Sequence, residues 1–131
     1  MASHAGALAG VVADLGAPGA NRGEAQGDSY LGIEDLTGSG FGDTLAGNGL
    51  ANILTGEAGH DRLSGGAGND TLTGDGTANL LSGGGGNDLL AGGAGADTLV
   101  GDGGIDTASY ATSAAPVTVD LAAGACAAIF L

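Results

Sequence analysis

An acidic side chain recurs at a fixed spacing through the middle of the chain. Aspartate or asparagine occupies every ninth position eight times, at Asp43, Asn52, Asp61, Asp70, Asn79, Asp88, Asp97 and Asp106. Each follows a glycine-rich segment, whose unhindered backbone can turn carbonyl oxygens toward a ligand. Carboxylate and carbonyl oxygens are the ligands of a hard cation such as Ca²⁺, which takes about six to eight of them. The spacing therefore favours rows of cation sites, because the carboxylates would otherwise repel one another.

The acidic positions belong to a nine-residue repeat that contains no insertion or deletion. Eight consecutive units run from Gly38 to Ser109 and read GSGFGDTLA, GNGLANILT, GEAGHDRLS, GGAGNDTLT, GDGTANLLS, GGGGNDLLA, GGAGADTLV and GDGGIDTAS. Position 1 is glycine in every unit, and position 8 is leucine in all but the last, where it is Ala108. A flexible linker would drift in register, so we expect this block to fold.

Each unit combines a turn with a short strand. Positions 1 to 6 join glycines to Asn or Asp, which close tight turns and tolerate positive φ. Positions 7 to 9 alternate a large apolar residue with small polar neighbours, the pattern of a half-buried strand of three residues. One such strand buries too little by itself, so the units must stack around a thin leucine core. Because a turn reverses the chain after every unit, two units make one coil.

The units GGAGNDTLT, GGGGNDLLA and GGAGADTLV resemble the GGxGxDxUx nonapeptide of RTX (hemolysin-type) calcium-binding repeats. The resemblance covers residues 38–109, with 29–37 (SYLGIEDLT) as a weaker first unit. It implies an all-β fold, a right-handed parallel β-roll with two nonapeptides per coil, whose turns hold Ca²⁺ between successive coils. We expect calcium binding and folding to be one event, since the stacked carboxylates oppose folding until a cation neutralises them.

Alternate units lie on the same edge of such a roll, so a site needs acids two units apart. One edge carries Asn52, Asp70, Asp88 and Asp106, and the other carries Asp43, Asp61, Asn79 and Asp97. The uninterrupted pairs are Asp70/Asp88, Asp88/Asp106 and Asp43/Asp61. We predict about three well-formed calcium sites from these pairs, with Asp97 half-matched. The carbonyl ligands are expected from the intact turns, at Gly66, Gly68, Gly83, Gly85, Gly86, Gly101 and Gly103.

Some units depart from the pattern in their turns. Three of them lack glycine at position 4, where they carry Phe41, Leu50 and Thr77. Because Phe41 falls in the first of these units, Asp43/Asp61 is the least regular of the three pairs. Asp75 and Asp102, at position 2 of their units, could add outer-shell oxygens or remain solvated turn residues.

Composition restricts the partners of the chain. Its 131 residues carry a net charge of −13, and Arg22 and Arg62 are the only basic side chains besides two histidines. Such a charge disfavours nucleic acid and anionic membranes and attracts cations. Cys126 is the single cysteine, which excludes an internal disulfide. No stretch approaches the ~20 apolar residues of a membrane span.

The two ends of the chain resemble each other. Residues 2–15 and 108–121 align without gaps at an offset of 106, with seven of fourteen positions identical. This duplication predicts a longer module that contains the repeat block. We expect a flanking segment over 1–28 with a partial strand at VVADL, the β-roll over 29–109, and the start of a second module or a cap strand (VTVDL) over 110–131.

The leading interpretation is a non-enzymatic calcium-binding module of a secreted protein, acting as a scaffold or secretion-linked repeat domain. The resemblance implies type I secretion, and sites of the ~10⁻⁴ to 10⁻³ M class fill only outside the cell. An alternative is the repeat portion of a secreted RTX enzyme of protease, lipase or epimerase type, with its catalytic domain or further RTX modules elsewhere in a longer parent. An adhesin or ice-binding segment and a disordered tether are further alternatives.

Overall fold

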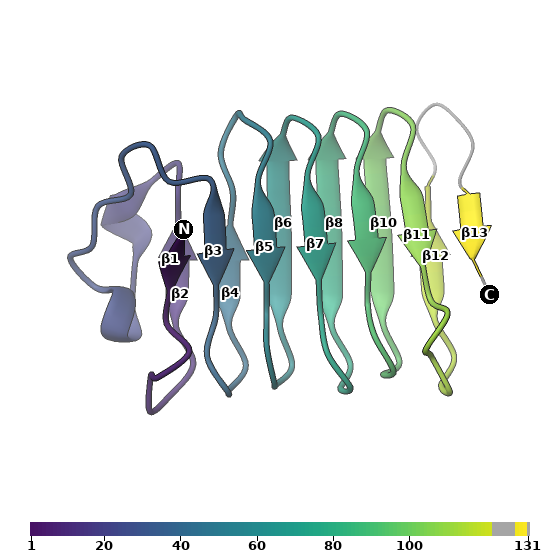
Figure 1. Ribbon diagram of the computed structural model, residues 1–131, viewed down its shortest axis with the longest axis horizontal. Helices are drawn as coiled ribbons and strands as arrows, with labels where there is room; N and C mark the ends of the chain where they lie inside the picture. Colours follow the sequence, from purple (N-terminus) through teal and green to yellow (C-terminus); the bar gives the residue numbers. More distant parts are fainter. Residues whose placement is uncertain (122–127, 131) are drawn as a thin grey trace.

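The repeat units fold into two stacks of parallel strands joined by tight turns (Figure 1). The computed structural model describes residues 1–121 and the backbone of 128–130. The odd sheet has seven strands: β1 (Ala2–Ser3), β3 (Asp35–Thr37), β5 (Ile53–Thr55), β7 (Thr71–Thr73), β9 (Leu89–Ala91), β11 (Thr107–Ser109) and β13 (Ala128–Phe130). The even sheet has six: β2 (Val12–Asp14), β4 (Thr44–Ala46), β6 (Arg62–Ala67), β8 (Leu80–Gly85), β10 (Thr98–Gly103) and β12 (Thr118–Asp120).

Successive units alternate between the two sheets. Strand β5 therefore pairs with β7 and β7 with β9, all in parallel, and each residue faces the one eighteen positions further along the chain. The predicted parallel β-roll with two nonapeptides per coil is confirmed. The turns form two rows, one before the odd strands and one before the even strands, at the upper and lower margins of Figure 1.

The leucines of position 8 form the core between the sheets. Each is at most 1% exposed: Leu45, Leu54, Leu63, Leu72, Leu81, Leu90 and Leu99. Leu36 extends the column of the odd sheet before Leu54, and Ala108 continues it after Leu90. This single layer of side chains is the thin core that the repeat predicts.

Three strands of the even sheet are longer than the predicted three residues. Strands β6, β8 and β10 have six residues, because pairing continues into the following turn, with Gly66 beside Gly84 and Gly84 beside Asp102. Four of the six residues in these added pairs are glycine, whose backbone can follow both the strand and the start of the turn. A strand of three residues is correct for the odd sheet from β3 to β11 and wrong for these three even strands.

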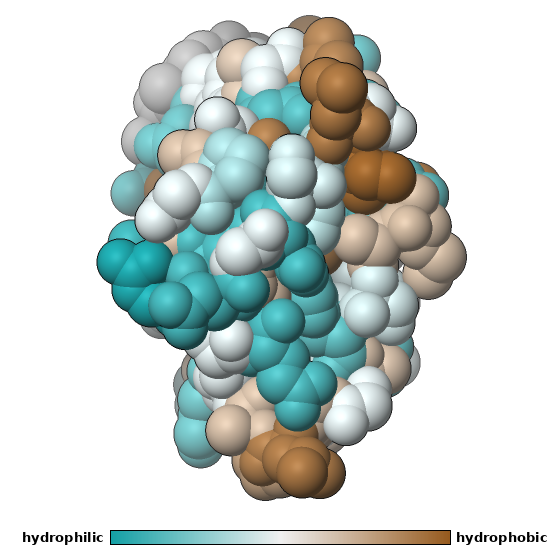
Figure 2. Space-filling model, turned by 90° about the vertical axis from the view of Figure 1, so that its left-hand side faces the viewer, coloured by the Kyte–Doolittle hydropathy of each residue, from teal (hydrophilic) through white to brown (hydrophobic). Residues whose placement is uncertain are grey.

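The flanks continue both sheets. At the N-terminal end, β1 pairs with β3 and β2 with β4. The segment between β2 and β3 contains the short 3₁₀ helices η1 (Pro18–Ala20) and η2 (Gly23–Ala25), and Arg22 bridges Val12 on the free edge of β2. The surface at this end is largely polar, with apolar surface at its margins (Figure 2).

At the C-terminal end, β12 pairs with β10 in the even sheet. Residues 122–127 and 131, which include Cys126, lie outside the described residues. Within the described part of the chain, no helix has the length and apolar character needed to cross a membrane.

Candidate metal sites

The position-6 side chains form a hydrogen-bonded column along each row of turns. The Asp88 Oδ1 atom accepts a hydrogen bond from the backbone N–H of Asp70 at 2.8 Å, and Asp106 Oδ1 accepts one from Asp88 N–H at 3.0 Å. On the other edge, Asp61 Oδ1 accepts from Asp43 N–H at 2.9 Å. Each of the three predicted pairs is therefore adjacent in space.

The second carboxylate oxygen of four aspartates has no partner. The Oδ2 atoms of Asp61, Asp70, Asp88 and Asp97 are buried and accept no hydrogen bond within the described structure. These residues are only 2–3% exposed. A buried carboxylate oxygen without a donor or cation is strongly unfavourable. The four atoms therefore mark places where an external hydrogen-bond donor or cation would stabilise the protein.

The glycine at position 1 creates the space beside such an oxygen. Asp70 Oδ2 lies where a side chain on Gly65 would begin, and the Gly83 carbonyl oxygen of the next coil lies 2.6 Å from that same point. Two oxygens thus face one space from adjacent coils. Sequence analysis did not include Gly65 among the site residues, although the presence of glycine at position 1 in all eight units was the available signal.

Five turns, which we call the glycine turns, share one backbone form. They span 56–61, 65–70, 83–88, 92–97 and 101–106. In each, position 2 has positive φ, and in all but 92–97 position 4 does as well, for example 111° at Gly68 and 132° at Gly86. The Gly68 carbonyl oxygen also lies where a side chain on Gly86 would begin. Close approach therefore requires glycine at position 4 in all five turns, and conformation requires it as well in every turn except 92–97.

Two of the predicted carbonyl ligands take part in contacts between turns. Gly85 and Gly103 each accept a hydrogen bond of 2.7 Å, from the N–H groups of Gly68 and Gly86 respectively. A carbonyl oxygen has a second lone pair. One acceptor position on each of these two oxygens is nevertheless used by the fold.

The other predicted carbonyl positions line the rows of turns. The Gly66 oxygen faces the Cα of Gly84 in the next coil, and Gly83 lies beside the Asp88 carboxylate. Gly101 lies beside the Asp106 carboxylate. The candidates thus occupy the same rows as the aspartates.

The remaining three turns are closed by side chains, and we call them the braced turns: 38–43, 47–52 and 74–79. In each, the side chain of position 2 accepts a hydrogen bond from the N–H of position 4, in the pairs Ser39–Phe41 (3.2 Å), Asn48–Leu50 (2.8 Å) and Asp75–Thr77 (2.8 Å). No residue of these turns has positive φ. A polar residue at position 2 here replaces the glycine conformation at position 4.

The braced turns also satisfy their position-6 side chains. Asp43 Oδ2 accepts from Ser39 N–H at 2.6 Å, and its Oδ1 accepts from Val11 N–H and from the Ser39 hydroxyl. Of the acids at position 2, Asp75 braces its own turn, and Asp102 accepts a hydrogen bond from the Ser82 hydroxyl. The Asp43 carboxylate therefore has protein donors for both oxygens, which the carboxylates of Asp61, Asp70, Asp88 and Asp97 lack.

Electrostatics agrees with this division. Burial raises the pKa of Asp61 to about 6, with the charges of Asp43 and Asp75 adding to the increase. Burial is also the main cause of the raised pKa of Asp70 and of Asp88, each next to a further carboxylate in its column. The ionised columns are thus unfavourable without a cation.

No basic side chain neutralises the columns. Within the described residues the one ion pair joins His4 Nε2 to Asp28 Oδ2 at 3.9 Å, at the N-terminal end. The described residues also contain no group of three His, Cys, Asp or Glu side chains that could hold one metal ion. An ion in the glycine turns would therefore depend on backbone carbonyls as well as carboxylates, the donor set of Ca²⁺.

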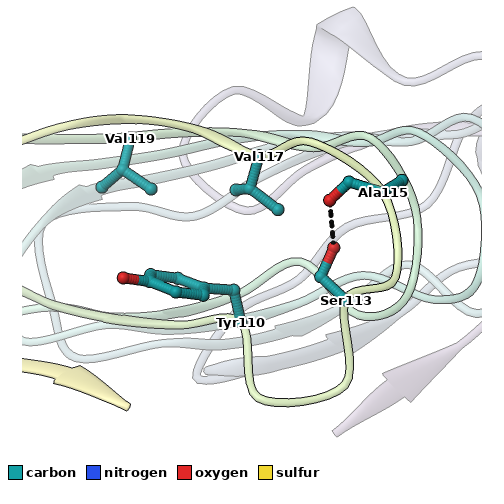
Figure 3. A pocket seen from close by; sticks show the side chains of 5 residues that line it. All are labelled: Tyr110, Ser113, Ala115, Val117 and Val119. Carbon is teal, nitrogen blue, oxygen red and sulfur yellow. Dashed lines mark hydrogen bonds between the residues drawn. The ribbon is translucent and has the colours of Figure 1, made fainter. Parts of the chain in front are cut away.

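A pocket of about 480 Å³ lies where the repeats end and is lined by Tyr110, Ser113, Ala115, Val117 and Val119. It adjoins the glycine turn 92–97, because the Ser113 hydroxyl also donates to the Gly95 carbonyl at 3.2 Å. Tyr110 faces the two valines, and the Ser113 hydroxyl donates a hydrogen bond to the Ala115 carbonyl (Figure 3). Because its lining has no charged side chain, this pocket is not a candidate metal site.

Comparison with known families identifies the repeats. The model of four copies of the RTX calcium-binding nonapeptide repeat matches residues 37–72 and again 73–108, more than half of the chain. The comparisons with curated proteins and with solved structures found no match. The in-register nonapeptides, the β-roll and the buried aspartate columns are thus those of a chain that belongs to the RTX calcium-binding nonapeptide repeat family.

Proposed function

We propose that this chain is a calcium-binding β-roll module in which Ca²⁺ lies in the glycine turns, between adjacent coils. The observation that carries the proposal is the set of four buried, unpartnered Oδ2 atoms, all of them in glycine turns. The position-6 side chains of the braced turns have protein partners instead. A hard cation bound beside these four oxygens would account for this difference.

The strongest sites are proposed on the edge that precedes the odd strands. There the glycine turns 65–70, 83–88 and 101–106 are consecutive, so an ion beside Asp70 or Asp88 has a glycine turn on both sides. The proposed ligands are these carboxylates, the Gly83 carbonyl and, in the turns, the carbonyls of Gly66, Gly68, Gly86 and Gly101. The Asp43/Asp61 pair is weaker, because protein donors already surround Asp43.

Calcium binding is proposed to drive folding, rather than to follow it. Each column stacks carboxylates at the spacing of neighbouring strands, where like charges repel. The core is a single layer of leucines, and the chain contains 30 glycines that lose much entropy on ordering. Ion binding then supplies stabilisation that the core lacks. The equilibrium is therefore between the folded chain with bound Ca²⁺ and the unfolded chain with free Ca²⁺.

The module is proposed to act as a non-enzymatic scaffold of a secreted protein. Its two histidines support this, because His4 contacts the Tyr30 hydroxyl and His60 the Ala78 carbonyl, so neither is paired with a serine, threonine or cysteine. Extracellular calcium would fill sites that stay empty inside the cell. The alternative, a repeat portion of a secreted enzyme, differs only in what a longer parent carries, and the flanking gene sequence would decide it.

A calcium titration tests the proposal. The chain is prepared in EDTA, and β-structure is followed by far-UV circular dichroism while calorimetry counts the ions bound. We expect a transition from coil to β-structure with Ca²⁺, reversed by EDTA and not reproduced by Mg²⁺, which demands a smaller octahedral site. Equal β-structure in EDTA and in calcium, with no heat of binding, would overturn it.

A further inference from the structure

The turn 74–79 has the shape of a cation site but holds an amide nitrogen. Beside Gly65, two oxygens from adjacent coils face each other, Asp70 Oδ2 and the Gly83 carbonyl. At the equivalent point beside Gly74 lie Asn79 Nδ2 and the Gly92 carbonyl. A hydrogen-bond donor thus stands where the glycine turn has an oxygen that lacks a partner.

The Asn79 amide nitrogen donates hydrogen bonds to three oxygens. Its Nδ2 donates to Asp75 Oδ1 at 3.1 Å, to the Thr77 carbonyl at 3.1 Å and to the Gly92 carbonyl at 3.3 Å. Its Oδ1 accepts from Asp61 N–H at 2.9 Å, which keeps the nitrogen directed at the three oxygens. Two of these oxygens belong to the same turn and one to the next coil, so the amide joins two coils as a bridging ion would.

We propose that the Asn79 amide takes the place of a calcium ion in the turn 74–79, so that this turn joins 92–97 without metal. The inference rests on the proposed function, because it assigns the ion's place in the glycine turns. It makes 74–79 a metal-free joint between two glycine turns of the same edge, 56–61 and 92–97. The braced turn 47–52 differs, since Asn52 Nδ2 donates to Glu34 and Asn48.

The substitution Asn79→Asp tests this inference. It keeps the size of the side chain and replaces the donor by a fifth buried oxygen without a partner. We expect calorimetry to count about one more bound Ca²⁺ per chain than in the wild type, and the folding transition to need more calcium. Gln26→Glu is the matched control, since it makes the same chemical change at an exposed residue of the N-terminal segment.

Ion count separates the proposal from a purely structural role. If Asn79 only braced its turn, Asn79→Asp would weaken folding with no added ion. A second variant, Thr77→Gly with Asn79→Asp, gives this turn the same pattern as the glycine turn 101–106 (GDGGID) and should also gain an ion.

An unchanged ion count in both variants, or failure of both to fold at millimolar calcium, overturns the inference and leaves the proposed function standing. If instead the wild type binds no calcium, the proposed function fails, and the inference fails with it. A gain of one ion in either variant, absent in Gln26→Glu, supports the inference.

Discussion

The glycine turns and the braced turns share one repeat period and one strand register, yet they close in different ways. In a braced turn such as 38–43, Ser39 donates to the position-6 carboxylate and accepts from the backbone of Phe41. In a glycine turn such as 65–70, the backbone adopts positive φ and the carboxylate of Asp70 keeps a buried oxygen without a partner. One class is closed by its own side chains, and the other leaves a buried carboxylate oxygen without a protein partner.

The two edges of the roll distribute these classes differently. The edge before the odd strands begins with a braced turn and continues with three glycine turns, whereas the edge before the even strands alternates the two. Calcium dependence should therefore concentrate on the edge that carries Asp70, Asp88 and Asp106.

Gly65→Ala should cause the largest loss of stability. Its methyl group would meet Asp70 Oδ2 and lie 2.6 Å from the Gly83 carbonyl, so it would fill the proposed ion position. We expect about 1–3 kcal/mol of steric destabilisation, together with loss of the ion beside Asp70, measured by calcium titration. Gly76→Ala in a braced turn is the control, because nothing lies within 4 Å of its added methyl group. Equal behaviour of the two variants would contradict the difference between the classes.

Asp88→Ala should weaken calcium binding more than Asp97→Ala. Asp88 lies between two glycine turns, whereas the turn of Asp97 is followed by the non-repeat residues after Ser109. We expect calorimetry to show a loss of about two ions for Asp88→Ala and about one for Asp97→Ala. Asp120→Ala, an exposed change in β12, should leave the ion count unchanged. Similar losses for Asp88 and Asp97 would refute the pairing of alternate turns.

Acid should partly replace calcium. The pKa of Asp61 in the folded chain is about 6, above its ordinary value of 3.8, so the folded state binds more protons between these values. That stabilisation is complete below pH ~3.8 and is lost as the pH rises through about 6. In EDTA, β-structure measured by circular dichroism should increase from pH 7 to pH 5. Asp61→Asn should reduce this increase, and a decrease in the wild type would disagree with the raised pKa.

Ser39→Ala should have the smallest effect. It removes the hydroxyl contacts to Asp43 and Phe41 but keeps the backbone N–H that serves Asp43 Oδ2. We expect a loss of about 0.5–1.5 kcal/mol, the net value of an ordinary hydrogen bond, in thermal unfolding with calcium present. The ion count should not change. A lost ion would show that the braced turn 38–43 also holds calcium.

Much of the architecture could be predicted because the period is strict. The core could be predicted from position 8. Leucines nine residues apart can pack against one another only if two units form one coil. The two aligned ends of the chain supply β2 and β12, the outermost strands at opposite ends of the even sheet, and these strands start 106 residues apart. These features depend on spacing, which is a property of sequence.

The division of the turns was only partly visible in the sequence. Phe41, Leu50 and Thr77 marked the irregular units, but their partners Ser39, Asn48 and Asp75 looked like ordinary turn residues. Which oxygens remain without a donor depends on contacts between residues 18 positions apart, and no local pattern records these contacts.

The repeat, the core and the acidic columns follow from residue type and period alone, and the same pattern predicts ligands for a hard cation. Which carboxylates are satisfied by the protein depends on how the coils stack, because only the stacking brings each oxygen to its donors. Asn79 illustrates the reason: the same nine-residue spacing places an amide or a carboxylate at this point, and only its three oxygen neighbours give the nitrogen its role.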